Sequence, residues 1–337
     1  MVKIGIVGAG FTGYMHTEVY KQFPDIKIAG IADIKGDRAK YLAEKTGTIP
    51  FYSIDSFLSK PDITIIDLCI PTYLHKEFVL KIAESGKDII CEDPIALKIE
   101  DAEEMIKKCQ EKKIRLMIGD IIRFWPEYSY LKKVYDTKRF GNLLSITFTR
   151  LSSKPLLSAD NWVLNNDYSG GPLLDIHIHD IDFLLYLTGK KPEKVYTAGK
   201  KTDNIYEHIY TTYKFSDGII ANAECGWDLP RNYPSLTSFT GIFEKAVVEY
   251  NSRNKPSLII YYADGKTDRP LIETKTIQTP EGNTINLGGY FYKLRYLIEH
   301  TIANKPFQVV NSNNILTSLQ IVSKEKESLE TDKEVLI

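Results

Sequence analysis

Cysteine is scarce in this chain: only Cys69, Cys91, Cys109 and Cys225 occur, and no two of them form a CxxC pair. A disulfide framework is therefore not expected, and buried free thiols in a reducing compartment fit better. No apolar run approaches the roughly 20 residues that span a bilayer. The N-terminus "MVKIGIVGAG" enters a strand pattern without a signal-peptide core. We expect a cytoplasmic protein that does not act in a membrane.

An excess of either positive or negative charge is also lacking. The net charge is −1, so the chain has no electrostatic footprint for nucleic acid, and we expect no such partner. Internal repeats, low-complexity tracts and linkers are missing as well. With 337 residues, 43% of them hydrophobic and 26% charged, the composition is that of a globular protein of about two domains.

The first 120 residues alternate short apolar runs with helical patterns, which predicts a parallel sheet covered on both faces. After Arg123 the chain becomes rich in longer Tyr-, Thr- and Ile-containing runs, typical of a mostly antiparallel sheet. The predicted fold class is α/β, with a doubly wound domain over residues 1–122 and an α+β domain over residues 123–337. The helices expected in these domains span 11–23, 37–46, 74–85, 100–112, 127–138, 172–187, 290–303 and 311–330.

The stretch "VGAGFTG" places Gly8, Gly10 and Gly13 between the first strand and the first helix. In a dinucleotide site the first glycine permits the turn, the second admits the pyrophosphate, and the third lets helix pack on strand. The helix N-terminus then faces the anion. The alternative is a plain strand–helix turn. The residues this loop offers to a cofactor are Gly8, Ala9, Gly10, Phe11, Thr12 and Gly13.

Asp33 ends the second predicted strand, 20 residues after Gly13. An acid at this position accepts hydrogen bonds from the adenosine ribose and repels a 2′-phosphate, so NAD is favoured over NADP. Lys35 leaves NADP open, and a helix-capping role is the alternative for Asp33.

The segment "GGPLLDIHIHDIDFLLYLTG" predicts a helix in which Asp175, His179, Asp182 and Tyr186 line one face beside an apolar one. A carboxylate one turn from a histidine suits proton transfer near neutral pH, although a structural histidine is an equal alternative. A metal site is not expected, because His177 and His179 do not share a helix face.

The stretch "IICEDPIA" ends an apolar run with Glu92, Asp93 and Pro94. Acids at the exit of such a strand lie where open α/β sheets hold their ligands. Together with "GAGFTG", "CIPTYLH", "RFWP" and "GGPLLDIHIHDID", in this order, the stretch resembles the glucose–fructose oxidoreductase / inositol dehydrogenase (Gfo/Idh/MocA) family over essentially the whole length.

The resemblance implies a Rossmann domain, a second domain with a large open sheet used in homo-oligomers, and oxidation or reduction of a sugar or cyclitol with a nicotinamide cofactor. By this resemblance, Asp175 and His179 match the substrate-binding acid and the catalytic histidine. The cofactor residues that it adds to the glycine loop and Asp33 are Ile70, Pro71, Thr72, His75, Glu92 and Arg123.

The chain departs from the family motif Glu-Lys-Pro at Asp93, which stands where the family has lysine. An aspartate accepts where lysine donates, and its charge would raise the pKa of a nearby histidine. Asp93 thus becomes a third catalytic candidate. Three functions stay open: an NAD-dependent dehydrogenase, a catalytically weakened NAD-binding regulator, and a reaction without net redox change on bound NAD.

Aromatic side chains of the substrate pocket are expected at loops and strand ends. The candidates are Trp162, Tyr168, Trp227 and Tyr233. We expect a homodimer or homotetramer, and a small sugar or cyclitol as substrate.

Overall fold

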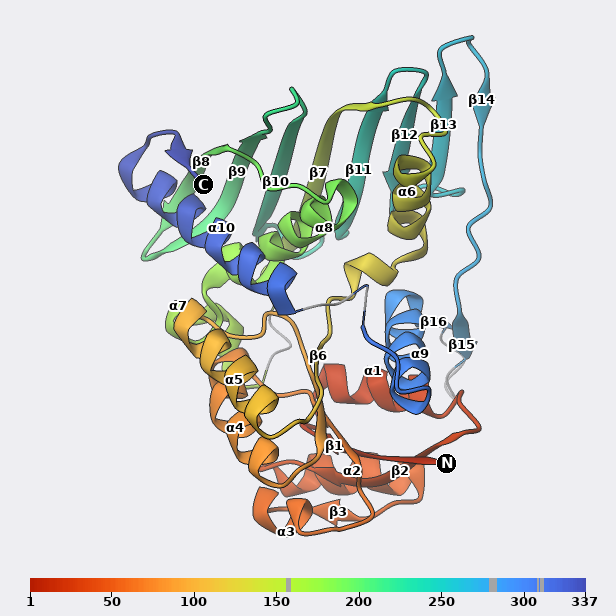
Figure 1. The fold of residues 1–337 in the computed structure, drawn as a ribbon, viewed down its shortest axis with the longest axis vertical. Coiled ribbons are helices and arrows are strands. Elements are labelled where there is room, and N and C mark those ends of the chain that lie inside the picture. Colours follow the sequence, from red (N-terminus) through yellow and green to blue (C-terminus); the bar gives the residue numbers. More distant parts are fainter. Residues whose placement is uncertain (156–158, 279–283, 308, 310–311) are drawn as a thin grey trace. The chain divides into compact units, whose positions relative to one another are not determined.

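The computed structural model describes residues 1–337 except 156–158, 279–283, 308 and 310–311. The chain forms two compact units (Figure 1). Unit 1 comprises Met1–Ile121, Ser158–Trp162 and Lys275–Leu316. Unit 2 comprises Ile122–Leu157, Val163–Thr274 and Thr317–Ile337.

Unit 1 contains a six-stranded parallel sheet in the order β3-β2-β1-β4-β5-β6. Strand order reverses between β1 and β4, which is the switch point at which doubly wound sheets bind ligands. The central strands are buried on both faces, as their unbroken apolar runs predict. The strands are β1 (Val2–Val7), β2 (Ile26–Ala32), β3 (Pro50–Phe51), β4 (Ile65–Leu68), β5 (Asp88–Cys91) and β6 (Leu116–Ile118).

Helices cover both faces of this sheet. Helix α1 packs beside α9, and α4 packs beside α5 (Figure 1). A short hairpin of β15 (Thr276–Gln278) and β16 (Thr284–Asn286) precedes α9. The helical elements are α1 (Phe11–Tyr20), α2 (Gly36–Thr46), α3 (Ile54–Leu58), η1 (Thr72–Leu74), α4 (His75–Glu84), α5 (Ile99–Glu111) and α9 (Gly288–Ile302).

Unit 2 contains a mixed, mostly antiparallel sheet of nine strands in the order β14-β13-β12-β11-β7-β10-β9-β8-β17. Only the β7–β10 pair is parallel among the pairings of this sheet in the described residues. The strands are β7 (Leu143–Ser153), β8 (Lys194–Thr202), β9 (Ile205–Lys214), β10 (Ile220–Leu229), β11 (Leu236–Phe243), β12 (Ala246–Asn251), β13 (Leu258–Tyr262), β14 (Thr267–Asp268) and β17 (Val335–Leu336).

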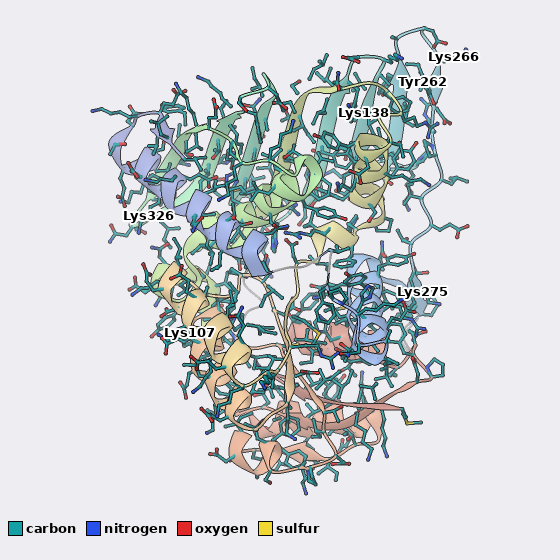
Figure 2. The ribbon with its side chains drawn as sticks, in the orientation of Figure 1. Lys107, Lys138, Tyr262, Lys266, Lys275 and Lys326 are labelled. Atoms are coloured by element: carbon teal, nitrogen blue, oxygen red, sulfur yellow. The ribbon has the colours of Figure 1, made fainter. Side chains whose placement is uncertain are left out.

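One face of this sheet carries the helices of unit 2 (Figure 1). Side chains under them, such as Ile146, Val195 and Val248, are fully buried. On the periphery, charged side chains such as Lys138 and Lys326 are exposed (Figure 2). The helical elements are η2 (Ile122–Phe124), α6 (Pro126–Asp136), η3 (Ala159–Leu164), α7 (Asn166–Ser169), η4 (Leu173–His177), α8 (Ile178–Thr188) and α10 (Ser312–Thr331), of which η3 and α10 include residues of both units.

The predicted α/β fold class is confirmed, with one difference in the path of the chain. Residues 275–316 were expected in the second domain, but they pack within unit 1. Helix α9 lays Phe291 against Phe23, with 5.2 Å between ring centroids, and Tyr290 against His16, with 5.5 Å. These contacts give α9 its place beside α1.

Among the described residues, no helix combines the length and the apolar character that crossing a bilayer would require.

Candidate cofactor and substrate site

The loop between β1 and α1 shows three glycines with three different surroundings. A Cβ added at Gly8, whose φ is +99°, would lie 2.2 Å from the Cys69 carbonyl oxygen, and one at Gly13 would lie 2.0 Å from the Gly8 carbonyl oxygen. A Cβ at Gly10 would meet nothing within 4 Å. Two glycines therefore close the turn against backbone, while the third faces open space where a pyrophosphate fits.

Asp33 follows β2 directly and turns its carboxylate back onto this loop. Its Oδ2 accepts from the Ala9 amide at 2.7 Å, and its Oδ1 accepts from the Lys35 amide at 2.7 Å. Each carboxylate oxygen keeps a further lone pair for a ribose hydroxyl. Of the remaining loop residues, Phe11 is 66% exposed and Thr12 is half-buried. The residues present fit a dinucleotide, with the adenosine half on the β2 side.

His75 ties together the two loops that follow β4 and β5. Its Nε2 lies 2.9 Å from the Ile70 carbonyl oxygen, and its Nδ1 lies 3.1 Å from the Pro94 and 3.2 Å from the Ile95 carbonyl oxygens. Burial lowers the pKa of the His75 imidazole despite these carbonyls. His75 thus fixes the loop containing Ile70, Pro71 and Thr72 against the segment that follows Glu92.

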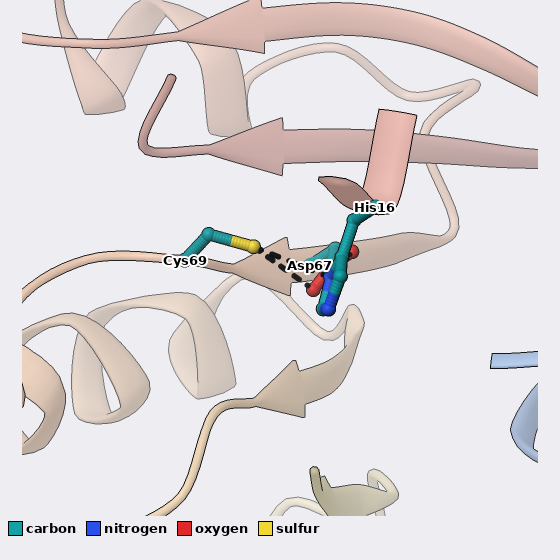
Figure 3. A group of neighbouring side chains, drawn as sticks. All are labelled: His16, Asp67 and Cys69. Atoms are coloured by element: carbon teal, nitrogen blue, oxygen red, sulfur yellow. Dashed lines mark hydrogen bonds and ion pairs between the residues drawn. The ribbon is translucent and has the colours of Figure 1, made fainter. Parts of the chain in front are cut away.

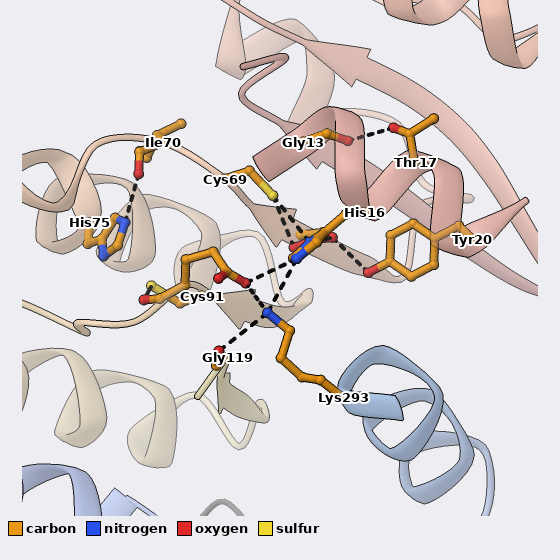
Figure 4. Close-up of polar contacts among 12 residues, drawn as sticks. Gly13, His16, Thr17, Tyr20, Cys69, Ile70, His75, Cys91, Gly119 and Lys293 are labelled. Atoms are coloured by element: carbon orange, nitrogen blue, oxygen red, sulfur yellow. Dashed lines mark hydrogen bonds and ion pairs between the residues drawn. The ribbon is translucent and has the colours of Figure 1, made fainter. Parts of the chain in front are cut away.

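Glu92 directly follows β5 and lies beside a buried polar cluster that the sequence did not single out. Lys293 of α9 donates to Glu92 Oε1 at 2.5 Å and lies 3.3 Å from His16 Nε2 and 3.3 Å from the Gly119 carbonyl oxygen (Figure 4). On the other side of the ring, His16 Nδ1 lies 2.7 Å from Asp67 Oδ2. His16, Asp67 and Lys293 have no exposed side-chain area, whereas 17% of the Glu92 side chain is exposed.

Asp67 is the fully buried end of this cluster. Burial alone would raise its pKa, but His16 and the Tyr20 hydroxyl, which donates to Oδ2 at 2.7 Å, more than offset this and lower it. A signal for Asp67 existed in the sequence, since an acid inside the apolar run "TIIDLCI" needs a buried partner. Lys293 gave no such signal.

His16, Asp67 and Cys69 also lie close enough together to suggest metal ligands (Figure 3). The 2.7 Å between His16 Nδ1 and Asp67 Oδ2 is a hydrogen-bond distance. A divalent cation would in addition face the Lys293 ammonium on the opposite side of the ring. Burial raises the pKa of the Cys69 thiol, so it stays protonated. We therefore interpret these three residues as part of a hydrogen-bonded network.

In unit 2, Asp175 lies in the π-helical turn η4 and His179 in the first turn of α8. Both side chains are half-buried. Desolvation raises the pKa of Asp175 to about 6, and the nearby charge of His179 opposes the shift only in part. The two residues that the sequence paired for proton transfer are thus electrostatically coupled. Their catalytic role, and that of the half-buried Asp93, stays a prediction.

Two neighbours of this pair differ from expectation. Asp182, predicted on the same face, is buried and binds the Arg123 guanidinium through both carboxylate oxygens. The i→i+5 turn of η4 breaks the regular 100° spacing between Asp175 and the residues of α8, while His179 and Asp182 both lie within that helix. Arg123, a predicted cofactor residue, has no exposed side-chain area and its charge is already paired, so its cofactor contact remains a prediction.

The four aromatic residues predicted for the substrate pocket also lie in different surroundings. Trp227 is 1% exposed in β10 and is a core residue, which corrects the expectation. The Arg253 guanidinium carbon lies over the Tyr233 ring, 4.4 Å from its centroid. Tyr168 is 43% exposed. The Trp162 ring lies 6.3 Å from that of Tyr73.

Two family models match the chain, over residues 2–120 and 128–248. They are described as "Oxidoreductase family, NAD-binding Rossmann fold" and "GFO/IDH/MocA C-terminal domain". Among curated proteins, the chain is 28% identical to 2,7-anhydro-N-acetylneuraminate hydratase of Escherichia coli, over 72% of this chain and 66% of the relative. It is 29% identical to myo-inositol 2-dehydrogenase of Thermotoga maritima, over 59% of this chain and 58% of the relative.

The alignment thus spans less than two thirds of the length of these relatives. Among solved structures, a levoglucosan dehydrogenase in complex with NADH and levoglucosan superimposes with a TM-score of 0.85. It is 21% identical and covers 100% of this chain and 99% of that one. At this identity the likeness shows the fold.

Proposed function

Because this chain belongs to the GFO/IDH/MocA oxidoreductase family, whose N-terminal domain is an NAD-binding Rossmann fold, we propose that it is an NAD-dependent dehydrogenase acting on a hydroxyl-bearing carbon of a sugar, polyol or cyclitol. The observation that carries the proposal is the glycine loop, where only Gly10 faces open space and Asp33 stands beside it. Relatives named for inositol and levoglucosan support the substrate class.

Bound NAD supplies the acceptor for hydride. In this proposal the Gly8–Gly13 loop holds the pyrophosphate, Asp33 the adenosine ribose, and Glu92 the nicotinamide half. His179 takes the proton of the substrate hydroxyl, and Asp175 orients the imidazole or binds a neighbouring hydroxyl. The negative charge of Asp33 favours NAD over NADP.

A second candidate is a reaction without net redox change, such as addition or loss of water on a sugar. Two observations favour it: Asp93 stands in place of the family lysine, and one relative carries the name of a hydratase. Bound NAD would then end each turnover unchanged.

A panel of inositols, other polyols and anhydrosugars, incubated with the protein and NAD⁺, separates these candidates. NADH absorbance that grows with time supports the dehydrogenase. A new product by NMR without accumulated NADH supports the second candidate. NAD binding with neither result across the panel would count against both. Calorimetry with NAD⁺ and NADP⁺ tests the cofactor preference, and equal or tighter NADP⁺ binding would overturn it.

A further inference from the structure

Glu92 stands on the nicotinamide side of the sheet edge. Asp33 follows β2 and the glycine loop follows β1, so a dinucleotide with its adenosine at Asp33 extends across the switch point toward β4 and β5. Glu92 directly follows β5. It is also the member of the buried cluster whose side chain is partly exposed, at 17%. The charge of this carboxylate therefore acts on the redox-active half of the cofactor.

Lys293 is the centre of a chain of buried polar contacts. Its ammonium donates to Glu92 Oε1 and lies 3.3 Å from the Gly119 carbonyl oxygen. His16 Nε2 lies 3.3 Å from both Lys293 Nζ and Glu92 Oε1, and His16 Nδ1 lies 2.7 Å from Asp67 Oδ2. The chain of contacts runs from Asp67 through His16 and Lys293 to Glu92, with the lysine as its cation.

We propose that Lys293 is a positioning residue of the cofactor site, whose ammonium holds the Glu92 carboxylate in place at the carboxyl edge of the sheet. Position 93, next to this carboxylate, holds a second acid, so α9 supplies the positive charge from 200 residues further along the chain. Lys293 has no exposed side-chain area and reaches neither cofactor nor substrate itself. The inference rests on NAD binding at this edge and is independent of the substrate.

Removing the ammonium takes away the donor that holds Glu92 Oε1 at 2.5 Å. The Glu92 side chain, 17% of which is exposed, is then no longer fixed at the sheet edge. A carboxylate that leaves this place loses its attraction for the cationic nicotinamide of NAD⁺, whereas the binding of NADH, whose nicotinamide is neutral, hardly changes.

The test measures the dissociation constants of NAD⁺ and NADH at pH 7.5. In Lys293→Met the NAD⁺/NADH affinity ratio should fall by about tenfold relative to the unmodified protein, or about 1.4 kcal/mol. A merely structural loss would instead weaken the binding of both cofactors alike. Lys293→Arg, which retains the cation, should behave like the unmodified protein. Glu92→Gln should lower the ratio to the same extent, and combining it with Lys293→Met should lower the ratio no further.

Lys87→Met is the matched control. Lys87 lies at the opposite end of β5, is 7% exposed, and donates to the Lys60 and Ile63 carbonyl oxygens at 2.8 Å each. Its loss removes a buried lysine of the same sheet far from Glu92, and the affinity ratio should stay constant. If Lys293→Met does not fold, Lys293→Gln keeps a donor without the charge and should show the same fall.

An unchanged ratio in both uncharged variants, or a further fall when Glu92→Gln is added to Lys293→Met, would overturn the proposal. Failure of every variant and of the unmodified protein to bind NAD would instead contradict the proposed function.

Discussion

Gly10 and Gly13 are three residues apart in the sequence, but alanine should lower folding stability at Gly13 and NAD affinity at Gly10. A methyl group at Gly13 would meet the Gly8 carbonyl oxygen at 2.0 Å, and overpacking of this kind costs about 1–3 kcal/mol of unfolding free energy. A methyl group at Gly10 enters open space and should leave stability unchanged. It occupies the volume proposed for the pyrophosphate, so NAD affinity should fall by about tenfold or more, or about 1.4 kcal/mol.

Urea unfolding and NAD titration of Gly10→Ala and Gly13→Ala check this pair. Gly47→Ala is unsuitable as a control because its φ is +63° and strain would enter. Unchanged NAD affinity in a folded Gly10→Ala protein would contradict the assignment of the loop as the cofactor site.

Asp175 is expected to set the acidic limb of the pH–rate profile. Its pKa is raised to about 6 by desolvation, so the carboxylate that orients His179 forms only above that pH. Turnover in the oxidation direction should rise through pH 6, and Asp175→Asn should remove this limb while lowering the rate.

His179→Ala removes the proposed base and should lower kcat by about 10²–10⁴ with little change in NAD affinity. Steady-state kinetics from pH 5 to 9 test both variants, and unchanged turnover in His179→Ala would contradict the mechanism.

At the scale of elements, η4, β9 and α10 share a buried polar group. The Tyr213 hydroxyl donates to Glu325 Oε1 at 2.5 Å and lies 3.1 Å from His177 Nε2. Desolvation lowers the pKa of His177 to about 4 and raises that of Glu325 well above its usual value. His177 is thus neutral in the fold, and Glu325 holds its proton over a wider range than an exposed glutamate does.

The pH dependence of stability follows from these two shifts. Between about pH 4 and 6.5 the unfolded chain binds a proton at His177 that the fold lacks, so this group makes stability rise with pH. Above about pH 4.3 the fold holds a proton at Glu325 that the unfolded chain loses, so this group makes stability fall with pH. Each slope is about 1.4 kcal/mol per pH unit, and the two cancel where they overlap.

Glu325→Gln should therefore raise the unfolding free energy above about pH 6.5 relative to the unmodified protein. Below that pH its stability should rise with pH, because the His177 contribution is no longer cancelled. Urea unfolding at pH 5 to 8.5 measures this, with Glu330→Gln on the exposed face of α10 as the charge-matched control. Equal curves for the two variants would show that Glu325 is ionised in the fold.

The elements themselves were largely predictable, because each depends on local pattern. Helices expected at 100–112 and 127–138 are found at Ile99–Glu111 and Pro126–Asp136. The helix expected at 172–187 is instead a π-turn followed by α8. Since the choice of an i→i+5 bond depends on packing against the sheet, the sequence period could not indicate it.

At the scale of the whole molecule, strand register divides the large sheet into two different faces. Val195, Ile146 and Ala221 point to the helix-covered face and are fully buried. On the opposite face lie Tyr196, Tyr210, Ile220, Ile242 and Tyr261, each between 39% and 55% exposed. An apolar and aromatic surface that spans so many strands is typical of an interface between copies.

We therefore expect a homodimer or homotetramer, which Ile220→Lys together with Ile242→Lys should convert to a 38.4 kDa monomer. Light scattering at micromolar concentration measures the mass, and Gln110→Lys on α5 is the control for an added charge. A mass of 38.4 kDa for the unmodified protein would contradict the prediction.

The candidate site was predictable only where one stretch of chain makes it. The glycine loop, Asp33, and the pairing of Asp175 with His179 follow from local spacing. The partners of Glu92 do not, because His16, Asp67 and Lys293 lie on three elements separated by up to 277 residues. The return of residues 275–316 to unit 1 is equally non-local, since the amphipathic pattern of α9 does not indicate which surface it will cover.

The return of α9 has a consequence for the order in which the protein is made. A ribosome delivers residues 1–121 long before Lys293, and domains generally fold as they emerge. Until then, the nascent Rossmann unit carries Asp67 and Glu92 without their cation and leaves the α1 surface uncovered. We expect this unit to mature into a binding-competent form late in synthesis, so a nascent chain arrested before residue 293 should be sensitive to protease and should not retain NAD.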